Sequence, residues 1–457
     1  MPISRTYSAI LGRVGILARQ LTPPQALILG FAGLILAGAV LLSLPAASRD
    51  GQSVGFLTAL FTATSAVCVT GLVVVDTHDT YSLFGQIVTL VLLQAGGLGI
   101  MTLSTFALVA LGRRVSLKGR LLIQEAMNQL TLEGMVRLVR NVIIATVLVE
   151  GAGALVLAIR FVPQFGLAKG LYYSTYHAVS AFCNAGFDLL GGFRSLTGYV
   201  KDPLVSLTIA SLIIIGGLGF SVLVDIVQYR CTRHLHLHTK VVIATTAILI
   251  LTGTLALLGL EYSNPATLGR LSFPDKLLAA YFQAVTPRTA GFSTINIGQM
   301  RPATLLLVII LMFIGASPGS TGGGIKTSTF ATLLLAVRSV ITGKADVEIF
   351  GRRLPMTAVV RALSVAMISL AIVLCGTMIL AVTEGRSLTE VLFEVTSAFG
   401  TVGLSMGITP TLSSIGRIVI IMIMFAGRVG PLSIAVAVAQ RQQANGVRFP
   451  EERVMIG

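Results

Sequence analysis

The 457-residue sequence has little charge: 11% of its residues are charged, whereas 54% are hydrophobic. A soluble globular domain carries about 25% charged residues, so this shortage argues against a soluble enzyme with a large core. Several apolar stretches reach the roughly 20 residues that a helix needs to cross a bilayer. We therefore predict an all-α integral membrane protein that crosses the lipid bilayer several times.

Signals for secretion, metal binding and catalysis are also missing. Residues 1–24 lack the charged tip, apolar core and cleavage site of a signal peptide, and we interpret them as a cytoplasmic segment. The four cysteines show neither metal-ligand spacing nor a disulfide framework. Nothing resembles a nucleophile beside its base or a pair of catalytic carboxylates. We predict that the chain is not an enzyme and carries no cofactor.

Acidic residues are outnumbered by basic ones, 18 against 33, which gives a net charge of +15. In a soluble protein this excess would suggest a nucleic-acid partner. In a membrane protein it reports topology, because Lys and Arg concentrate in cytoplasmic loops. An N-terminus inside the cell puts 20 of the basic residues on the cytoplasmic side and 11 outside. We predict a plasma (cell inner) membrane protein with both termini in the cytoplasm and no nucleic-acid partner.

One unit occurs four times: an apolar span, a short helix, a glycine turn and a second span. The spans lie at about residues 25–46, 83–112, 138–161, 203–229, 241–260, 303–340, 358–383 and 415–439. The turn glycines, Gly71, Gly186, Gly291 and Gly403, are 115, 105 and 112 residues apart. A helix of about ten residues cannot cross the membrane and must re-enter it. We predict eight transmembrane helices plus four re-entrant pore helices with pseudo-four-fold symmetry about a central pore.

The predicted boundaries follow these units. They are a cytoplasmic N-terminal segment at 1–24, pore repeats at 25–112, 113–229, 230–341 and 342–440, and a cytoplasmic tail at 441–457. The second repeat begins with a cytoplasmic connector.

The four glycine turns are the candidate ion filter. Glycine takes a positive φ without steric cost, so successive carbonyls can point to one side and replace the hydration shell of a cation. No ring of Asp or Glu accompanies the turns, which favours a monovalent ion such as K⁺ over calcium. The alternative is that the turns merely reverse the chain. The candidate filter residues are Cys68, Val69, Thr70, Gly71, Cys183, Asn184, Ala185, Gly186, Arg288, Thr289, Ala290, Gly291, Gly400, Thr401, Val402 and Gly403.

The second span of the third repeat is interrupted. Residues 315–327 contain five glycines and a proline, which a regular helix does not tolerate. We hypothesise that this stretch is a gating loop below the filter; a hinge without gating is the alternative. It is not a nucleotide-binding loop, because Ile325 separates the glycines from the lysine and no strand precedes it. The candidate gate residues here are Gly315, Ser317, Pro318, Gly319, Gly322, Gly323, Gly324 and Lys326.

Arg428 lies in the matching span of the fourth repeat. An arginine at membrane depth costs several kcal/mol, so it needs water or a partner. It either faces the pore and limits conduction as part of the gate, or forms a structural pair with Glu150 or Asp225. Glycine clusters at 96–99 and 216–219 are interpreted as close helix packing, with hinges as the alternative.

Together, the repeats, turn glycines and glycine-rich interruption resemble the Trk/Ktr/HKT superfamily of potassium transporters. Residues 344–355 and 450–457 are similar to the membrane subunits of the Ktr type (KtrB), as is the number of spans. The resemblance implies a homodimer in which each protomer has its own pore, with a potassium filter at Gly71, Gly186, Gly291 and Gly403. It also implies an intramembrane gate at 315–327 with Arg428 below the filter, a cytosolic ring of nucleotide-binding subunits of the KtrA type, and Na⁺ as a candidate activator.

A secondary transporter with inverted repeats and alternating access is the alternative function. Two spans per unit argue against it, because consecutive units then keep one orientation.

Overall fold

The computed structural model describes residues 23–99 and 135–430. Several predicted features lie outside these residues: most of the N-terminal segment, the connector that opens the second repeat, the inner ends of spans 83–112 and 415–439, and the tail with its motif at 450–457.

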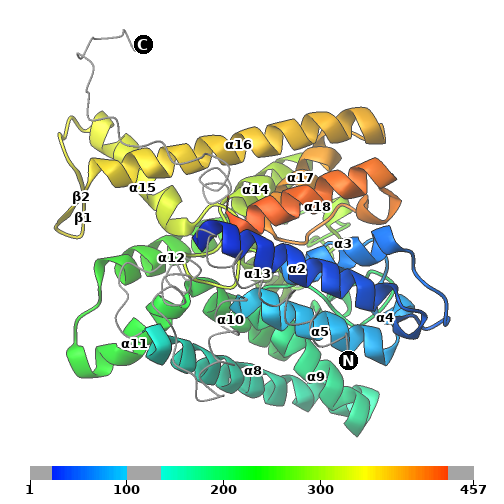
Figure 1. The fold of residues 1–457 in the computed structure, drawn as a ribbon. Coiled ribbons are helices and arrows are strands. Elements are labelled where there is room, and N and C mark those ends of the chain that lie inside the picture. The colour runs from blue at the N-terminus through cyan, green and yellow to red at the C-terminus, as the bar shows by residue number, and fades with distance from the viewer. Residues whose placement is uncertain (1–22, 100–134, 431–457) are drawn as a thin grey trace, which may run out of the picture.

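The described chain is built almost entirely from helices (Figure 1). Its α-helices are α2 (Pro23–Ser43), α3 (Phe56–Val67), α4 (Thr77–Thr80), α5 (Leu83–Leu98), α8 (Met135–Phe165), α9 (Leu167–Phe182), α10 (Pro203–Leu218), α11 (Phe220–Thr232), α12 (Leu237–Glu261), α13 (Phe273–Val285), α14 (Pro302–Phe313), α15 (Thr327–Ile341), α16 (Met356–Glu384), α17 (Leu388–Gly400) and α18 (Ser414–Val429). Strands β1 (Val347–Ile349) and β2 (Arg352–Leu354) form one antiparallel hairpin that pairs Val347 with Leu354. In Figure 1 this hairpin lies beside α15 at one end of the molecule.

Helix contacts group the chain into four sets. A long helix packs on the short helix that follows it in α2 with α3, α8 with α9, α12 with α13, and α16 with α17. Contacts of α5 with α9, α10 with α13, α14 with α17, and α18 with α3 then join each set to the next. The last of these joins the fourth set back to the first, so the sets form a closed circle.

Local sequence fixes several of the helix starts. Ser82, Asp202 and Ser413 accept hydrogen bonds from first-turn N–H groups of α5, α10 and α18, which satisfies donors that have no partner inside the helix. Ser387 and Glu390 form a reciprocal capping box at α17. These caps fix where the helices around the centre of the molecule begin.

Burial divides the helices into inner and outer ones. The C-terminal halves of α3, α9, α13 and α17 are buried, whereas the long helices expose large apolar side chains such as Leu148, Leu155, Leu251 and Met378. Four described helices, α2, α8, α12 and α16, are long and apolar enough to span a membrane by themselves, and the bent pair α10–α11 makes a fifth candidate. Exposed leucines on helices of this length are suited to lipid contact.

The second helices of the units are shorter than the predicted spans. We predicted an interruption only in the third unit, but α5, α10 and α18 also end early, at glycines with φ of 82°, 95° and 93°. At Gly219 the chain bends by 97° between α10 and α11. A Cβ atom there would lie 2.5 Å from the carbonyl oxygen of Pro318. The bend thus occurs where the interrupted segment of the third unit contacts the second unit. Gly219 therefore fits the alternative prediction for the cluster at 216–219, a hinge.

Candidate functional site

The four turn glycines lie together at the centre of the helices. A Cβ atom added to any of them would come within 2.2–2.7 Å of a carbonyl oxygen of another unit: Gly71 to Ala185, Gly186 to Ala290, Gly291 to Val402, and Gly403 to Thr70. Real Cβ atoms essentially never approach this closely. The four backbone segments therefore close into a ring, which we call the glycine ring, and each of its positions requires glycine.

Backbone conformation alternates along each turn. The ring glycines have φ between 69° and 90°, and the residue two positions earlier is also in the left-handed region, with φ between 50° and 72°. These earlier residues are Val69, Asn184, Thr289 and Thr401. Left-handed Val and Thr are rare, and strain of this kind collects at functional sites. Alternating φ turns neighbouring carbonyls toward a common side, as ion coordination requires.

A hydroxyl side chain braces each turn from behind. In all four units, the main-chain carbonyl of a Ser or Thr near the end of the short helix accepts a hydrogen bond from the N–H of the residue before the glycine. The hydroxyls of Ser65 and Ser397 accept the N–H of Gly71 and Gly403. Those of Ser180 and Thr286 instead donate to the carbonyls of Phe187 and Phe292. We did not single out these residues from the sequence; their recurrence five or six positions before each glycine is the signal that could have found them.

Replacing Ser397 with alanine should loosen one turn without unfolding the protein. The N–H of Gly403 would lose its acceptor, which costs about 1–3 kcal/mol for a buried donor. We expect the K⁺/Na⁺ selectivity ratio to fall by about three- to tenfold, as measured by competing fluxes in proteoliposomes. Ser364→Ala is the control, because Ser364 is on the exposed side of α16 and bonds only to Val360 within its own helix. A ratio equal in the two variants would show that the brace has no role in selectivity.

The other predicted filter residues lie around the ring. Cys68 and Cys183 are the C-cap residues of α3 and α9 and are fully buried. Arg288 is also buried, but its guanidinium turns away to donate to the Thr246 hydroxyl of α12 at 3.2 Å. Gly400 is the last residue of α17, and a Cβ atom added to it would lie 2.5 Å from the carbonyl oxygen of Met312. Arg288 thus does not present its charge to the ring.

A cavity of ≈ 590 Å³, which we call the outer cavity after the predicted topology, lies against the glycine ring. Gly71, Gly186, Gly291 and Gly403 all line it, together with residues that follow them in the chain. Asp76 and Asp188 also line this cavity. Carboxylates at the approach to a ring of carbonyl oxygens would attract cations.

The interrupted segment lies directly against the ring. Residues 314–326 connect α14 to α15 without helix. A Cβ on Gly322 would lie 2.0 Å from the Thr289 hydroxyl oxygen, and the N–H of Gly323 donates to the Thr401 hydroxyl at 3.0 Å. Ser317 and Thr321 donate their N–H groups to the carbonyls of Gly217 and Gly216 in α10. The loop is therefore anchored to the second and fourth units as well as to its own. The predicted gate glycines and Pro318 all belong to this loop.

Arg428 holds the loop from the end of α18. Its guanidinium donates to the carbonyl of Thr321 in the loop, and to the carbonyls of Gly96 and Gly97 in α5. The predicted alternative of a pair with Glu150 or Asp225 is wrong. Glu150 accepts from Gln94 at 3.2 Å, and Asp225 contacts His236 at 2.7 Å.

The glycine clusters of the first two units correspond in position to Gly427 and Arg428 of the fourth unit. An added Cβ on Gly96 or Gly216 would lie 1.9–2.0 Å from the last carbonyl of α3 or α9, and one on Gly427 would lie 1.9 Å from the carbonyl of Phe399, the next-to-last residue of α17. These glycines therefore serve close packing, as predicted for the first two clusters. The next residue in each unit is Gly97, Gly217 and Arg428. The fourth unit therefore carries a cation where the first two carry glycine.

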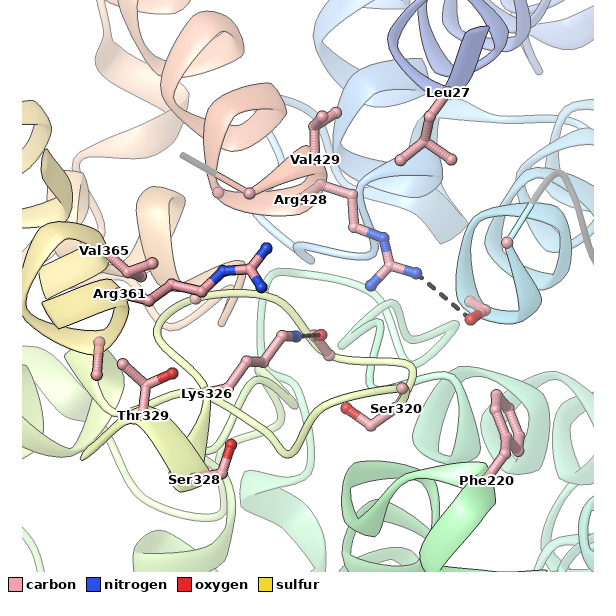
Figure 2. A pocket seen from close by; sticks show the side chains of 18 of the residues that line it. Leu27, Phe220, Ser320, Lys326, Ser328, Thr329, Arg361, Val365, Arg428 and Val429 are labelled. Atoms are coloured by element: carbon pink, nitrogen blue, oxygen red, sulfur yellow. Dashed lines mark hydrogen bonds between the residues drawn. The ribbon is translucent and has the colours of Figure 1, made fainter. Parts of the chain in front are cut away.

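A second cavity of ≈ 410 Å³, which we call the inner cavity after the predicted topology, lies on the loop side (Figure 2). Its lining includes Gly322, Gly324 and Lys326 from the loop, Arg361 from α16 and Arg428 from α18. Lys326 donates from Nζ to the Gly322 carbonyl at 2.7 Å. The loop thus stands between the glycine ring and this cavity.

Comparisons with known proteins show which proteins the chain is similar to. The model of the family described as TrkH, cation transport protein, matches residues 28–447. The Ktr system potassium uptake protein B of Bacillus subtilis (strain 168) is 46% identical over 438 residues, 96% of this chain and 97% of that protein. The potassium/sodium uptake protein NtpJ of Enterococcus hirae is 41% identical over 96% of this chain and 98% of its own length. The crystal structure of the potassium transporter TrkH from Vibrio parahaemolyticus has a TM-score of 0.71 and 19% identity, covering 92% of this chain and 86% of that one, which shows a shared fold.

Proposed function

Because the chain belongs to the TrkH family of cation transport proteins, which are multi-pass membrane proteins and not enzymes, we propose that it takes up potassium across the plasma membrane through a channel-like pore. The observation that carries this proposal is the closed glycine ring: four backbone segments, each with alternating positive φ, whose glycines touch one another. Main-chain oxygens in such a ring replace the water around a monovalent cation.

The proposed architecture is four span–pore helix–span repeats around this ring, with the predicted boundaries and both termini in the cytoplasm. The closed circle of helix contacts supports it. Each repeat then supplies one short helix, one turn and one brace to the pore. The outer cavity faces the cell exterior and the inner cavity the cytoplasm.

The proposed gate is the loop at 314–326 with Lys326 and Arg428. The loop lies against two ring segments and is held by hydrogen bonds to the second and fourth units, and Arg428 links it further to α5 of the first unit. A loop in this position must move before an ion can pass from the ring to the inner cavity.

The proposed partners are a second copy of the chain and a cytosolic ring of nucleotide-binding subunits of the KtrA type. Two relatives are named as components of a Ktr system, in Bacillus subtilis and Vibrio alginolyticus. The name of NtpJ includes sodium, which supports Na⁺ as an activator or second transported ion.

Potassium uptake in cells that lack their own uptake systems tests the proposal, with and without the cytosolic subunit. We expect growth at low potassium to be restored, and restored best when both are present. Purified protein in proteoliposomes separates the pore from the alternative of alternating access. A fixed stoichiometry of coupled exchange would favour the carrier, whereas uncoupled K⁺ flux that saturates only at high concentration favours the pore.

External pH should modulate uptake through Asp188. Burial raises the pKa of its carboxyl to about 6, so the side chain is negative above that pH and neutral below it. Losing this charge from the outer cavity lowers the local cation concentration. We expect the apparent K⁺ affinity to fall about two- to fivefold between about pH 7.5 and pH 5, with Asp188→Asn showing the weaker affinity at both values. Asp50→Asn, at an exposed position outside this cavity, should keep the wild-type pH profile; a profile unchanged in Asp188→Asn would refute this role.

A further inference from the structure

Three cationic side chains from different elements point into the inner cavity. Figure 2 shows Lys326 of the loop, Arg361 of α16 and Arg428 of α18 directed toward the same space. Among the described residues that line this cavity there is no Asp or Glu. None of the three takes part in an ion pair within the described chain. This is an unusual lining for a passage that conducts cations.

The protein atoms around these side chains leave their charge unbalanced. Lys326 and Arg428 bond only to main-chain carbonyls, which are neutral acceptors. An ammonium has three N–H donors, and Lys326 uses one of them within the described residues. The guanidinium of Arg361 makes no hydrogen bond to any described residue. Cations in a partly desolvated site are costly unless a negative group accompanies them.

The N-terminus of α15 opens on the same cavity. The helix runs from Thr327 to Ile341, and its N-cap residue, Lys326, provides no side-chain cap. Ser328 and Thr329, in the first turn, line the cavity and are seen beside Lys326 in Figure 2. The N–H of Thr327 already donates to the carbonyl of Ala316, but the next N–H groups of the first turn and the helix dipole both favour an anion at this end.

We propose that the inner cavity binds an oxyanion of the phosphate type, either free phosphate or the headgroup of an anionic lipid. Arg361 offers a planar guanidinium group that matches two phosphate oxygens. Arg428, which already donates to three main-chain carbonyls, adds its positive charge and its remaining N–H donors. Lys326 and the first turn of α15 supply the remaining donors. The volume of ≈ 410 Å³ holds such a group together with water.

This inference deepens the proposed gating and rests on it for its consequence. A bound anion would tie α16 and α18 to the loop, because its three cationic partners come from these elements. The loop would then be held against the ring. Potassium flux should be lower when the anion is bound, whereas binding itself does not depend on whether the protein conducts.

The test measures binding and flux separately on the purified full-length protein. Binding of inorganic phosphate is measured by isothermal titration calorimetry in neutral detergent, and binding of phosphatidylglycerol by native mass spectrometry. We expect Arg361→Gln to weaken whichever ligand binds by about tenfold or more, the loss of one charged contact. Arg361→Lys should retain part of the affinity. Arg230→Gln, an exposed cation in the last turn of α11 outside the cavity, is the matched control.

The two sources of phosphate give different results. Calorimetric phosphate binding that Arg361→Gln abolishes assigns the site to the free ion. Phosphatidylglycerol retained by wild type and lost by Arg361→Gln assigns it to lipid, and K⁺ flux should then be lower in vesicles of phosphatidylcholine with phosphatidylglycerol than in phosphatidylcholine alone. Equal binding by wild type, Arg361→Gln and Arg230→Gln, or no binding by wild type, overturns the inference. Absence of K⁺ flux under every condition, with binding intact, would instead count against the proposed function.

Discussion

Replacing Gly291 with serine is expected to lower the K⁺/Na⁺ selectivity ratio by about tenfold or more. The residue has a φ of 79°, where any side chain adds strain of about 1–3 kcal/mol. Its Cβ would also lie 2.5 Å from the Val402 carbonyl oxygen, one of the atoms proposed to coordinate the ion. The collision must displace that oxygen, so the ring becomes wider or uneven and dehydrates K⁺ less well. Competing K⁺ and Na⁺ fluxes in proteoliposomes give the ratio.

Gly259→Ser is the matched control for this experiment. Gly259 is a helical glycine of α12, and an added Cβ there meets nothing within 4 Å apart from the neighbouring backbone of its own helix. The same substitution should therefore leave the selectivity ratio unchanged. Gly71→Ser should act like Gly291→Ser, since its Cβ would lie 2.5 Å from the carbonyl of Ala185. Folding is checked by size-exclusion chromatography; folded Gly291→Ser protein with wild-type selectivity would remove the filter assignment.

The turns could be located from sequence because their signal is local and repeated. A position with a positive φ can be recognised in the sequence because glycine alone adopts such a φ freely. Four glycines at similar spacing therefore indicate four such positions. The interrupted helix at 315–327 is equally visible, because proline and clustered glycines disfavour helix. The grouping of these glycines into one ring, however, is established by the atomic contacts.

Other parts of the site have no comparable signal in the sequence. Arg428 bonds to the carbonyl of Gly96, which is 332 residues away in the chain, and a main-chain acceptor can belong to any residue type. Hydropathy continues past Gly99 and Gly219, so the early ends of α5 and α10 were not predicted. At Gly219 the break coincides with the close approach of Pro318. The direction of each brace also depends on local backbone geometry: Ser65 accepts from an N–H whereas Ser180 donates to a carbonyl.

The second large effect concerns Arg428, whose replacement should release the loop. Arg428→Gln loses the charged hydrogen bonds to Thr321 in the loop and to Gly96 and Gly97 in α5. Hydrogen bonds of charged groups contribute about 1.5–3 kcal/mol each, so the closed arrangement loses a large part of its stabilisation. We expect the initial K⁺ flux into proteoliposomes to rise about tenfold or more. Shortening the loop by two residues should raise flux in the same direction.

Arg428→Lys separates tethering from simple repulsion of cations. A lysine keeps the positive charge below the ring, but its single ammonium lacks the planar fork that reaches carbonyls of α5 and the loop together. Since Arg428 acts as a tether in the proposed gate, Arg428→Lys should conduct within about threefold of Arg428→Gln. Wild-type flux in Arg428→Lys, with raised flux in Arg428→Gln, would mean that the charge alone limits conduction. Unchanged flux in both, beside the Arg230→Gln control, would show that the loop does not gate, because the side chain that links the loop to α5 would then have no influence on the passage of ions.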